Sequence, residues 1–411
     1  MQGYASGKYT QMKENEMWGY VGQEYDKDED YDELLAIINS PDYFRPFSKR
    51  LLAFYNDILG GNLNCTEAAK DLRGRLNQKG LFLSRGTINN WFNGGTEPQY
   101  GDEDRRRLFV VAFALELSIE QTERLFHNVF LDKAFNRRNR NEFIYLYCIY
   151  NKKPLTIAEG LISRLDAADS AAAPIGHTVQ SQLLGEAAKR DVSEDEILEY
   201  ILANPYNFSL NNTAAKKRVQ KLLKELTGYG GNKGLAQQEQ ERYQIDVEGE
   251  GGEKENVYKN KDRASVDYML SVLFNMDFAQ KDNPGIVPIR ETFRRKEITA
   301  HFPEKQTLSK ENPSSYELRK NIILLFFYKF WASALLDKQA ESKTGQGLCK
   351  NKMSKYDKFV SEMDEILFEC GFSPLYSGNP YDWLFKYCSA CHNPLDAFRG
   401  ILASKLPELW N

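Results

Sequence analysis

The side chains best suited to chemistry lie in one segment, which reads Leu83-Ser-Arg-Gly-Thr-Ile-Asn-Asn-Trp-Phe-Asn-Gly-Gly-Thr-Glu-Pro98. A helix that begins at Ser84 would carry, on one face, only the polar residues Arg85, Thr87, Asn89 and Asn90. Arginine can donate two hydrogen bonds to guanine, asparagine can pair with adenine, and threonine can contact a phosphate or the thymine methyl group. These residue types in this pattern favour contacts with nucleic acid.

The same segment contains the signals that would position such a helix. Ser84 is a residue type favoured at a helix N-cap, and Ile88 and Trp91, three residues apart, supply a buried edge together with Leu83. Gly94 and Gly95 then provide a left-handed stop, and Pro98 prevents the helix from continuing. The pattern predicts a short helix with one apolar and one polar face.

With these features, the segment resembles the lambda-repressor-like (Xre-type) helix-turn-helix family, in which the second helix reads DNA. The matching positions are Ser84, Arg85, Thr87, Ile88, Trp91, Gly94 and Pro98, and residues 107–126 resemble the helices that follow in the family. The resemblance covers residues 45–126. It implies that Ile88 and Trp91 are core residues and that the DNA is lined by Ser84, Arg85, Thr87, Asn89 and Asn90.

The chain departs from the family before this helix. The preceding helix is expected to start at Thr66 or Glu67, which leaves more residues before Ser84 than the family usually has. Residues 73–82 therefore lengthen the helix or the turn. Positive charges in this extension could contact phosphates, and they belong to Arg73, Arg75 and Lys79.

Composition and periodicity favour an all-α fold, a multi-helix bundle that contains this helix-turn-helix. The chain has 411 residues, of which 42% are hydrophobic and 27% charged, as in ordinary globular proteins. Apolar residues recur at three- and four-residue intervals from Phe47 to Ile58, before Gly60, and Ser118 is the expected N-cap of a helix that runs through Leu125. Convincing strand alternation is absent. The formal net charge of −4 does not exclude a nucleic-acid partner, because residues 45–98 are locally basic.

Composition shifts suggest five segments. Residues 1–30 are expected to form a flexible acidic tail, 31–166 the helix-turn-helix domain with its following helices, and 177–227 a helical segment. Residues 228–263 mix Gly, Gln and charged residues and are expected to be a flexible linker, and residues 264–411 to form a C-terminal helical domain. Lys216-Lys217-Arg218, with Lys221 and Lys224, would form a basic helix face, a pattern typical of a solvated surface.

One internal similarity recurs at an offset of 240 residues. Residues 139–148, Asn-Arg-Asn-Glu-Phe-Ile-Tyr-Leu-Tyr-Cys, match residues 379–388, Asn-Pro-Tyr-Asp-Trp-Leu-Phe-Lys-Tyr-Cys, and each copy is followed by Pro-Leu. Asn is favoured at the N-cap, where Glu or Asp at the third helical position can bond back to the cap as a capping box. The pattern predicts a repeated helix pair whose role is packing.

Metal or catalytic chemistry finds little support. Cys388 and Cys391 lie one helical turn apart and could bind zinc if Cys370 or His392 joined them, but no second CxxC is present, and buried structural cysteines are the alternative. Haem attachment at Cys388–His392 would require export, and the N-terminus has no signal-peptide pattern. The histidines have no supporting nucleophile or metal spacing. We expect no cofactor, no metal and no enzymatic activity.

The sequence thus predicts a cytoplasmic, bacterial-type transcriptional regulator that binds double-stranded DNA, without a membrane segment. A homodimer is expected because single modules bind weakly, with residues 321–336 and the C-terminal repeat as the candidate interface. The C-terminal helical domain could also contact a protein partner. The alternative is a non-catalytic helical protein-interaction or defence-system adaptor that has kept the helix-turn-helix fold.

Overall fold

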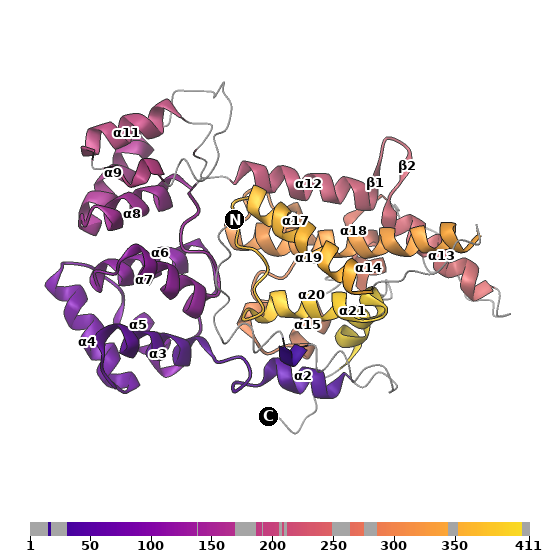
Figure 1. The fold of residues 1–411 in the computed structure, drawn as a ribbon, viewed down its shortest axis with the longest axis horizontal. Helices are drawn as coiled ribbons and strands as arrows, with labels where there is room; N and C mark the ends of the chain where they lie inside the picture. The colour runs from indigo at the N-terminus through magenta and orange to yellow at the C-terminus, as the bar shows by residue number, and fades with distance from the viewer. Residues whose placement is uncertain are drawn as a thin grey trace. The chain divides into compact units, whose positions relative to one another are not determined.

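The computed structural model describes residues 15–17, 31–137, 139–168, 186–190, 192–204, 208, 212–248, 264–274, 286–343 and 352–404. Within these ranges the chain is almost entirely helical, apart from one hairpin of two very short strands (Figure 1). The prediction of an all-α, multi-helix fold is confirmed. No helix in the described ranges is both long and apolar enough to cross a membrane.

The chain divides into two compact units. The N-terminal unit comprises residues 45–213 and 369–373, and the C-terminal unit comprises residues 1–44, 214–368 and 374–411. In the N-terminal unit the elements are α3 (Phe47–Leu59), α4 (Cys65–Gln78), α5 (Arg85–Asn93), α6 (Asp102–Ala114), α7 (Ile119–Leu125), the π-helical turn η2 (Phe126–Phe130), α8 (Arg140–Tyr150), α9 (Leu155–Ala168) and α11 (Glu194–Ala203). In the C-terminal unit they are α2 (Asp32–Asn39), α12 (Thr213–Thr227), β1 (Gly228–Tyr229), β2 (Asn232–Lys233), α13 (Leu235–Glu248), α14 (Val266–Phe274), α15 (Ile286–Thr292), α16 (Lys296–Thr299), α17 (Lys305–Ser309), α18 (Ser315–Lys343), α19 (Lys352–Glu369), α20 (Pro380–Ala390) and α21 (Pro394–Ala403).

These units correct the predicted domain boundaries. Residues 31–44 belong with the C-terminal unit, because the side chain of Asn39 bonds the carbonyl of Thr292 and the amide of Arg294, and the ring of Phe44 packs edge-on against Trp383. The expected linker is wrong for residues 228–248, which form the hairpin and α13 instead. Apolar spacing is weak in α13, but Ala236 and Glu239 are buried. The remainder of that linker and most of the acidic tail lie outside the described residues.

Local signals place the helices of the N-terminal unit. As predicted, Gly60 ends α3, with a φ of 63°, and Ser118 caps α7. The structure adds a capping box between Ser118 and Gln121. The core of this unit is aromatic: the ring of Phe109 on α6 lies 4.6 Å from Phe126 and 4.7 Å from Tyr145. Aromatic pairs at such distances add to the stabilisation that burial itself provides.

The long helix α18 is the core of the C-terminal unit. Every residue from Tyr316 to Tyr328 is buried, and the rest of the segment to Leu336 is buried or half-buried. A helix that is apolar all round is one that other helices cover. Residues 321–328 are therefore unavailable for the predicted dimer interface, and the dimer itself stays a prediction. The repeat helix α20 is equally unsuitable, since all its residues are buried.

The predicted repeat is present as a repeated geometry. Asn139 caps α8 by accepting from the amides of Asn141 and Glu142, and Asn379 caps α20 by accepting from the amide of Tyr381. The Pro-Leu pairs then lead into α9 and α21, which pack on α8 and α20. Both copies are core elements of their units.

The acidic residue of each repeat does not close a capping box, which corrects that prediction. The carboxylate of Glu142 instead accepts two hydrogen bonds from Arg105 at 2.9 Å, and that of Asp382 accepts two from Arg319, at 2.8 and 2.6 Å. Each arginine also donates to a carbonyl six or more residues before the acid, namely that of Ala134 or of Pro374. We call this arrangement the buried arginine clamp. The acid and the carbonyl recur at the offset of 240 residues, so the repeat extends to the loops before α8 and α20, whereas the two arginines come from α6 and α18 and do not share that offset.

Asp364 on α19 is a half-buried carboxylate that accepts a hydrogen bond from the amide of Leu375 at 2.7 Å. Burial raises its pKa to about 6. The folded state therefore binds a proton at Asp364 more tightly than the unfolded state does. As a result, the ionised carboxylate destabilises the folded state above pH 6, and this destabilisation is relieved as the pH falls towards 4.

We expect Asp364→Asn to raise the free energy of unfolding at pH 7.5 by about 1–2 kcal/mol, because it removes the charge and keeps an oxygen for Leu375. The gain should shrink as the pH is lowered from 6 to 4. Urea denaturation of both proteins across this range measures it, and a gain that does not change with pH would contradict the assignment.

Candidate nucleic-acid interface

Helix α5 is positioned by the signals that the sequence contains. The Ser84 hydroxyl accepts a hydrogen bond from the Thr87 amide at 3.0 Å, and Gly94 ends the helix with a φ of 74°. A side chain at Gly94 would meet the Ser48 hydroxyl at 3.2 Å, so both backbone angle and space favour glycine there. The predicted N-cap and C-terminal stop are confirmed.

The apolar face of α5 is fixed in the core. Ile88, Trp91 and Phe92 are buried, and Leu83 is half-buried. The Trp91 ring lies 5.4 Å from that of Phe47, and the Phe92 ring 5.4 Å from that of Tyr55, so two aromatic pairs join α5 to α3. The prediction that Ile88 and Trp91 are core residues is confirmed. This packing fixes the rotation of α5 about its axis.

The opposite face of α5 presents polar groups to solvent. Arg85 and Asn90 are exposed, and Asn89 is half-buried. Among the described residues, no side-chain hydrogen bond or ion pair involves Arg85 or Asn89, while Asn90 contacts Thr96 at 3.4 Å. The two side chains best able to read base edges are therefore available.

The two hydroxyl groups at the start of α5 are partly occupied. Ser84 is exposed and Thr87 is half-buried, and their hydroxyl oxygens lie 2.8 Å apart. Ser84 also accepts the capping hydrogen bond. Each hydroxyl keeps some capacity for a phosphate oxygen, but their first role is to hold the end of the helix.

The basic residues before α5 are less available than the sequence suggested. Helix α4 begins at Cys65, slightly before the predicted start, so the extra residues extend both the helix and the turn. Arg75 pairs with Asp71 at 2.7 Å, Lys79 pairs with Glu116, and the Nε of Arg73 donates to the Ala69 carbonyl. A phosphate would have to compete with a carboxylate for two of the three predicted contacts.

Asp71 is held as an anion at this point. Partial burial raises its pKa, but the hydrogen bonds from Arg75 and Tyr55 outweigh burial, and its pKa lies below its ordinary value. The Arg75–Asp71 pair therefore stays charged at neutral pH, and its positive charge is locally neutralised. Among the described residues, Arg73 and Arg85 are the predicted cations without a carboxylate partner, and of these two Arg73 donates to a backbone carbonyl while Arg85 makes no side-chain hydrogen bond.

Sequence reasoning missed Phe82, in the turn between α4 and α5. Its side chain is 82% exposed, the largest fraction among the exposed large hydrophobic residues of the described ranges. The neighbours Leu81 and Leu83 are half-buried, so the turn directs the central residue of an apolar triplet to solvent. The sequence feature that could have identified it is the position of a phenylalanine two residues before a helix N-cap. Core packing does not require an aromatic side chain at that position.

The cysteine cluster offers weaker chemistry. Cys388 and Cys391 are both buried, and the Cys391 thiol donates to the Tyr387 carbonyl at 3.3 Å. His392 lies close to Asn393, with the ring nitrogen 3.3 Å from its amide oxygen. In the described part of the chain, no group of three or more potential ligands is arranged to hold a metal.

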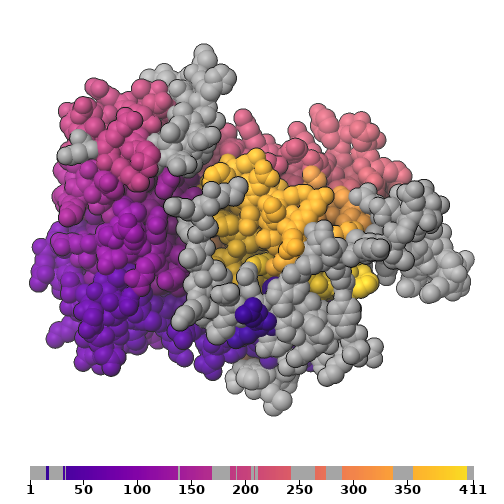
Figure 2. Space-filling model, viewed as in Figure 1, coloured from indigo at the N-terminus to yellow at the C-terminus, as the bar shows by residue number. Residues whose placement is uncertain are grey.

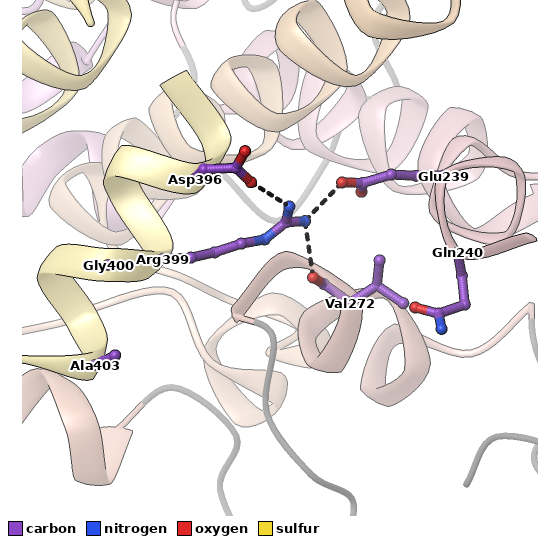
Figure 3. A pocket seen from close by; sticks show the side chains of 7 residues that line it. All are labelled: Glu239, Gln240, Val272, Asp396, Arg399, Gly400 and Ala403. Carbon is purple, nitrogen blue, oxygen red and sulfur yellow. Dashed lines mark hydrogen bonds and ion pairs between the residues drawn. The ribbon is translucent and has the colours of Figure 1, made fainter. Parts of the chain in front are cut away.

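One hollow of about 390 Å³ lies in the C-terminal unit beside Arg399 (Figure 3). The guanidinium donates to Glu239 at 2.7 Å and to the Val272 and Leu273 carbonyls, and Asp396 lies 3.5 Å away. The second oxygen of Glu239 accepts from the Tyr328 hydroxyl. These polar groups already form hydrogen bonds and ion pairs with one another. We therefore interpret the side chains that line the hollow as a structural cluster and not as a ligand site.

No protein-family model matches the chain, and neither the curated proteins nor the solved structures include a significant match. The resemblance of residues 84–98 to the lambda-repressor-like family therefore stays a prediction. The side chains of α5 and of the turn before it are the basis for assigning a function.

Proposed function

We propose that the chain is a DNA-binding transcriptional regulator in which α4 and α5 act as a helix-turn-helix and α5 enters the major groove. The observation that carries this proposal is the contrast between the two faces of α5. Its apolar face is locked into the core, while Arg85 and Asn89 on the other face have side-chain donors and acceptors open. The major groove, about 12 Å wide, accepts one such helix.

The N-terminal end of α5 suits a phosphate. The first amides of a helix have no partner within it and carry a partial positive charge. At α5 the cap satisfies the Thr87 amide, and Arg85 adds a full positive charge at the first helical position. Arg85 can therefore guide the helix end towards the duplex before any base is read.

The test is retardation of genomic duplex fragments by the full chain, followed by titration with salt. Binding that depends on phosphate contacts releases counterions and falls steeply as salt rises. We expect retarded fragments at 50 mM salt and much weaker binding at 200 mM. Absence of any retarded fragment at low salt would contradict the proposal.

The second candidate function is a non-catalytic interaction module, and the exposure of Phe82 together with the neutralised charges of Arg75 and Lys79 favours it. An apolar side chain in solvent suits a protein surface as well as a thymine methyl group. A homodimer also stays a prediction, and residues 316–328 of α18 and the helix α20 are too buried to supply its interface.

Phe82→Ser distinguishes these roles. If Phe82 contacts DNA, the serine variant should bind duplex about three- to tenfold more weakly, while its free energy of unfolding changes by less than about 0.5 kcal/mol because the site is exposed. Fluorescence anisotropy with a retarded fragment measures the first quantity and urea denaturation the second. Unchanged duplex affinity would assign Phe82 to a protein contact instead.

A further inference from the structure

Helix α12 concentrates positive charge in a chain whose formal net charge is −4. Residues 213–233 contain six Lys or Arg and a single acid, Glu225. Three exposed lysines, Lys217, Lys221 and Lys224, follow one another at four- and three-residue spacing and so lie in one row along the helix. The opposite face is buried through Ala215, Val219, Leu222 and Leu226.

Within the described part of the chain, no neighbouring acid offsets the charge of this row. Glu225 pairs with Lys329 at 2.6 Å, and Lys233 on β2 pairs with Glu241 at 2.6 Å. In the described ranges no carboxylate pairs with the three lysines of the row. The sequence favours a solvated basic face here, and the charge that no described acid offsets is also available to an anionic ligand.

A tight hairpin places an aromatic ring at the end of the row. Gly230 and Gly231 have φ values of 63° and 85°, the left-handed pair that a two-residue hairpin turn requires. A side chain at Gly228 would approach the Asn232 carbonyl to 2.5 Å, so the strands are close together. The hairpin projects beyond the end of α12 in Figure 1, and this segment forms part of the outer surface in Figure 2.

Tyr229 on β1 is 72% exposed, and the Lys224 amino nitrogen lies 5.1 Å from the centre of its ring. This is a cation–π distance, and it links the last lysine of the row to the ring. The ring therefore continues the row of charges and keeps most of its surface in solvent. We call Lys217, Lys221, Lys224 and Tyr229 the lysine–tyrosine face.

We propose that the lysine–tyrosine face binds single-stranded nucleic acid. Proteins that hold single strands combine a positive track for the backbone with aromatic rings on which bases stack. From Lys217 to Lys224 the helix rises about 10 Å, enough to follow about three phosphates. The exposed ring favours a nucleic acid over an acidic protein, because the carboxylates of a protein would bind the lysines alone and make no use of the ring. It also favours a single strand over a duplex, because the bases of a duplex are already stacked on one another.

The test uses the full chain and a fluorescein-labelled 20-nucleotide oligo(dT), with fluorescence anisotropy between 50 and 200 mM salt. Lys217→Gln with Lys221→Gln and Lys224→Gln should weaken binding at least about tenfold and reduce the slope of log affinity against log salt by about 2. The matched control replaces three other exposed lysines of the same unit, Lys296, Lys305 and Lys358, by Gln. It makes the same change in net charge and should alter affinity less than about twofold.

Tyr229 supplies a second, independent comparison. Tyr229→Ala should weaken oligo(dT) binding about tenfold, while Tyr229→Phe, which keeps the ring, should retain it. Circular dichroism should be unchanged in each variant, since all four side chains are exposed. Equal binding by the alanine and phenylalanine variants would overturn the stacking role.

The face is separable from the proposed role of α5. Arg85→Ala with Asn89→Ala should weaken oligo(dT) binding much less than the lysine triple variant does, so failure of either proposal would not imply failure of the other. The face is not a single-strand site if the lysine triple variant binds as the control does. The same conclusion follows if polyglutamate, or a duplex of equal length, competes as well as unlabelled oligo(dT).

Discussion

Arg105→Ala is expected to lower the free energy of unfolding of the N-terminal unit by about 3–5 kcal/mol, a large part of the roughly 5–15 kcal/mol that stabilises a typical domain. The Arg105 guanidinium is buried and donates to both oxygens of Glu142, to Asp132 at 2.8 Å, and to the carbonyls of Lys133 and Ala134. Alanine would leave the Glu142 carboxylate buried without its counter-charge. Removing one partner of a buried ion pair lowers the stability of the protein strongly, because the other charge is left buried alone. Replacing both partners by apolar residues of similar volume often has little effect.

The control is the neighbouring Arg106, whose side chain is 49% exposed and lies 3.5 Å or more from Glu103 and Glu159. Arg106→Ala should cost less than about 1 kcal/mol, as exposed pairs do. Urea denaturation followed by circular dichroism measures both variants. If the two substitutions cost the same, the buried arginine clamp does not stabilise the unit.

The pH dependence gives this prediction a second readout. Burial already raises the pKa of Glu142 above its ordinary value, against the opposing effect of Arg105. Without the arginine that pKa should rise further, so the folded variant would take up a proton at a higher pH than the parent does. The difference in free energy of unfolding between the parent protein and Arg105→Ala should therefore become smaller as the pH is lowered. Arg319→Ala in the C-terminal unit should also lower the free energy of unfolding, because it leaves the buried Asp382 carboxylate without its counter-charge.

The second large effect concerns DNA. Arg85→Ala with Asn89→Ala should lower the ratio of specific to non-specific duplex affinity by at least about 30-fold, since each side chain that reads a base edge discriminates by about 1–3 kcal/mol. Non-specific affinity should fall much less, because one phosphate contact at most is lost. Competition gel shifts with a retarded fragment and with a scrambled duplex measure the ratio.

The matched control is Arg164→Ala with Asn128→Ala. Both side chains are exposed in the same unit, and the double variant changes the net charge equally. It should keep the specificity ratio of the parent, and the helical circular dichroism of both variants should be unchanged. A control that loses specificity as fully as the α5 variant would show that overall charge, and not α5, decides binding.

Local signals in the sequence were sufficient to predict α5. Its N-cap at Ser84, its glycine stop at Gly94 and its buried Ile88 and Trp91 all depend on residues within about ten positions of one another. The helix caps of the repeat, Asn139 and Asn379, were predicted for the same reason. Side-chain capping and helical periodicity are short-range properties that a single sequence contains.

Long-range partners could not be predicted in this way. Arg105 stands in a run of three arginines after three acids, and nothing in that run distinguishes it from its neighbours. Arg107 does pair with Asp104, but Arg105 turns inward to Glu142, 37 residues away. Lys79 likewise meets Glu116 from another part of the chain. Which of two similar charges is buried depends on tertiary packing.

The aromatic segment of α18 shows a further limit. Residues 322–328 are apolar or aromatic on every face, a pattern that fits a buried core helix and an exposed interface equally well from sequence alone. Only the surrounding helices decide between them, and they bury Tyr316 to Tyr328. The exposure of Phe82, one apolar residue between two half-buried leucines, was hidden for the same reason.

Site-specific photocrosslinking tests most directly whether α5 contacts DNA. A photoreactive phenylalanine analogue would replace Asn89 on α5 in one protein and the exposed Asn128 on η2 in another, and each would be irradiated with a labelled, retarded duplex. We predict that position 89 crosslinks to the duplex and position 128 does not. Crosslinking at position 128 but not at 89 would contradict the account.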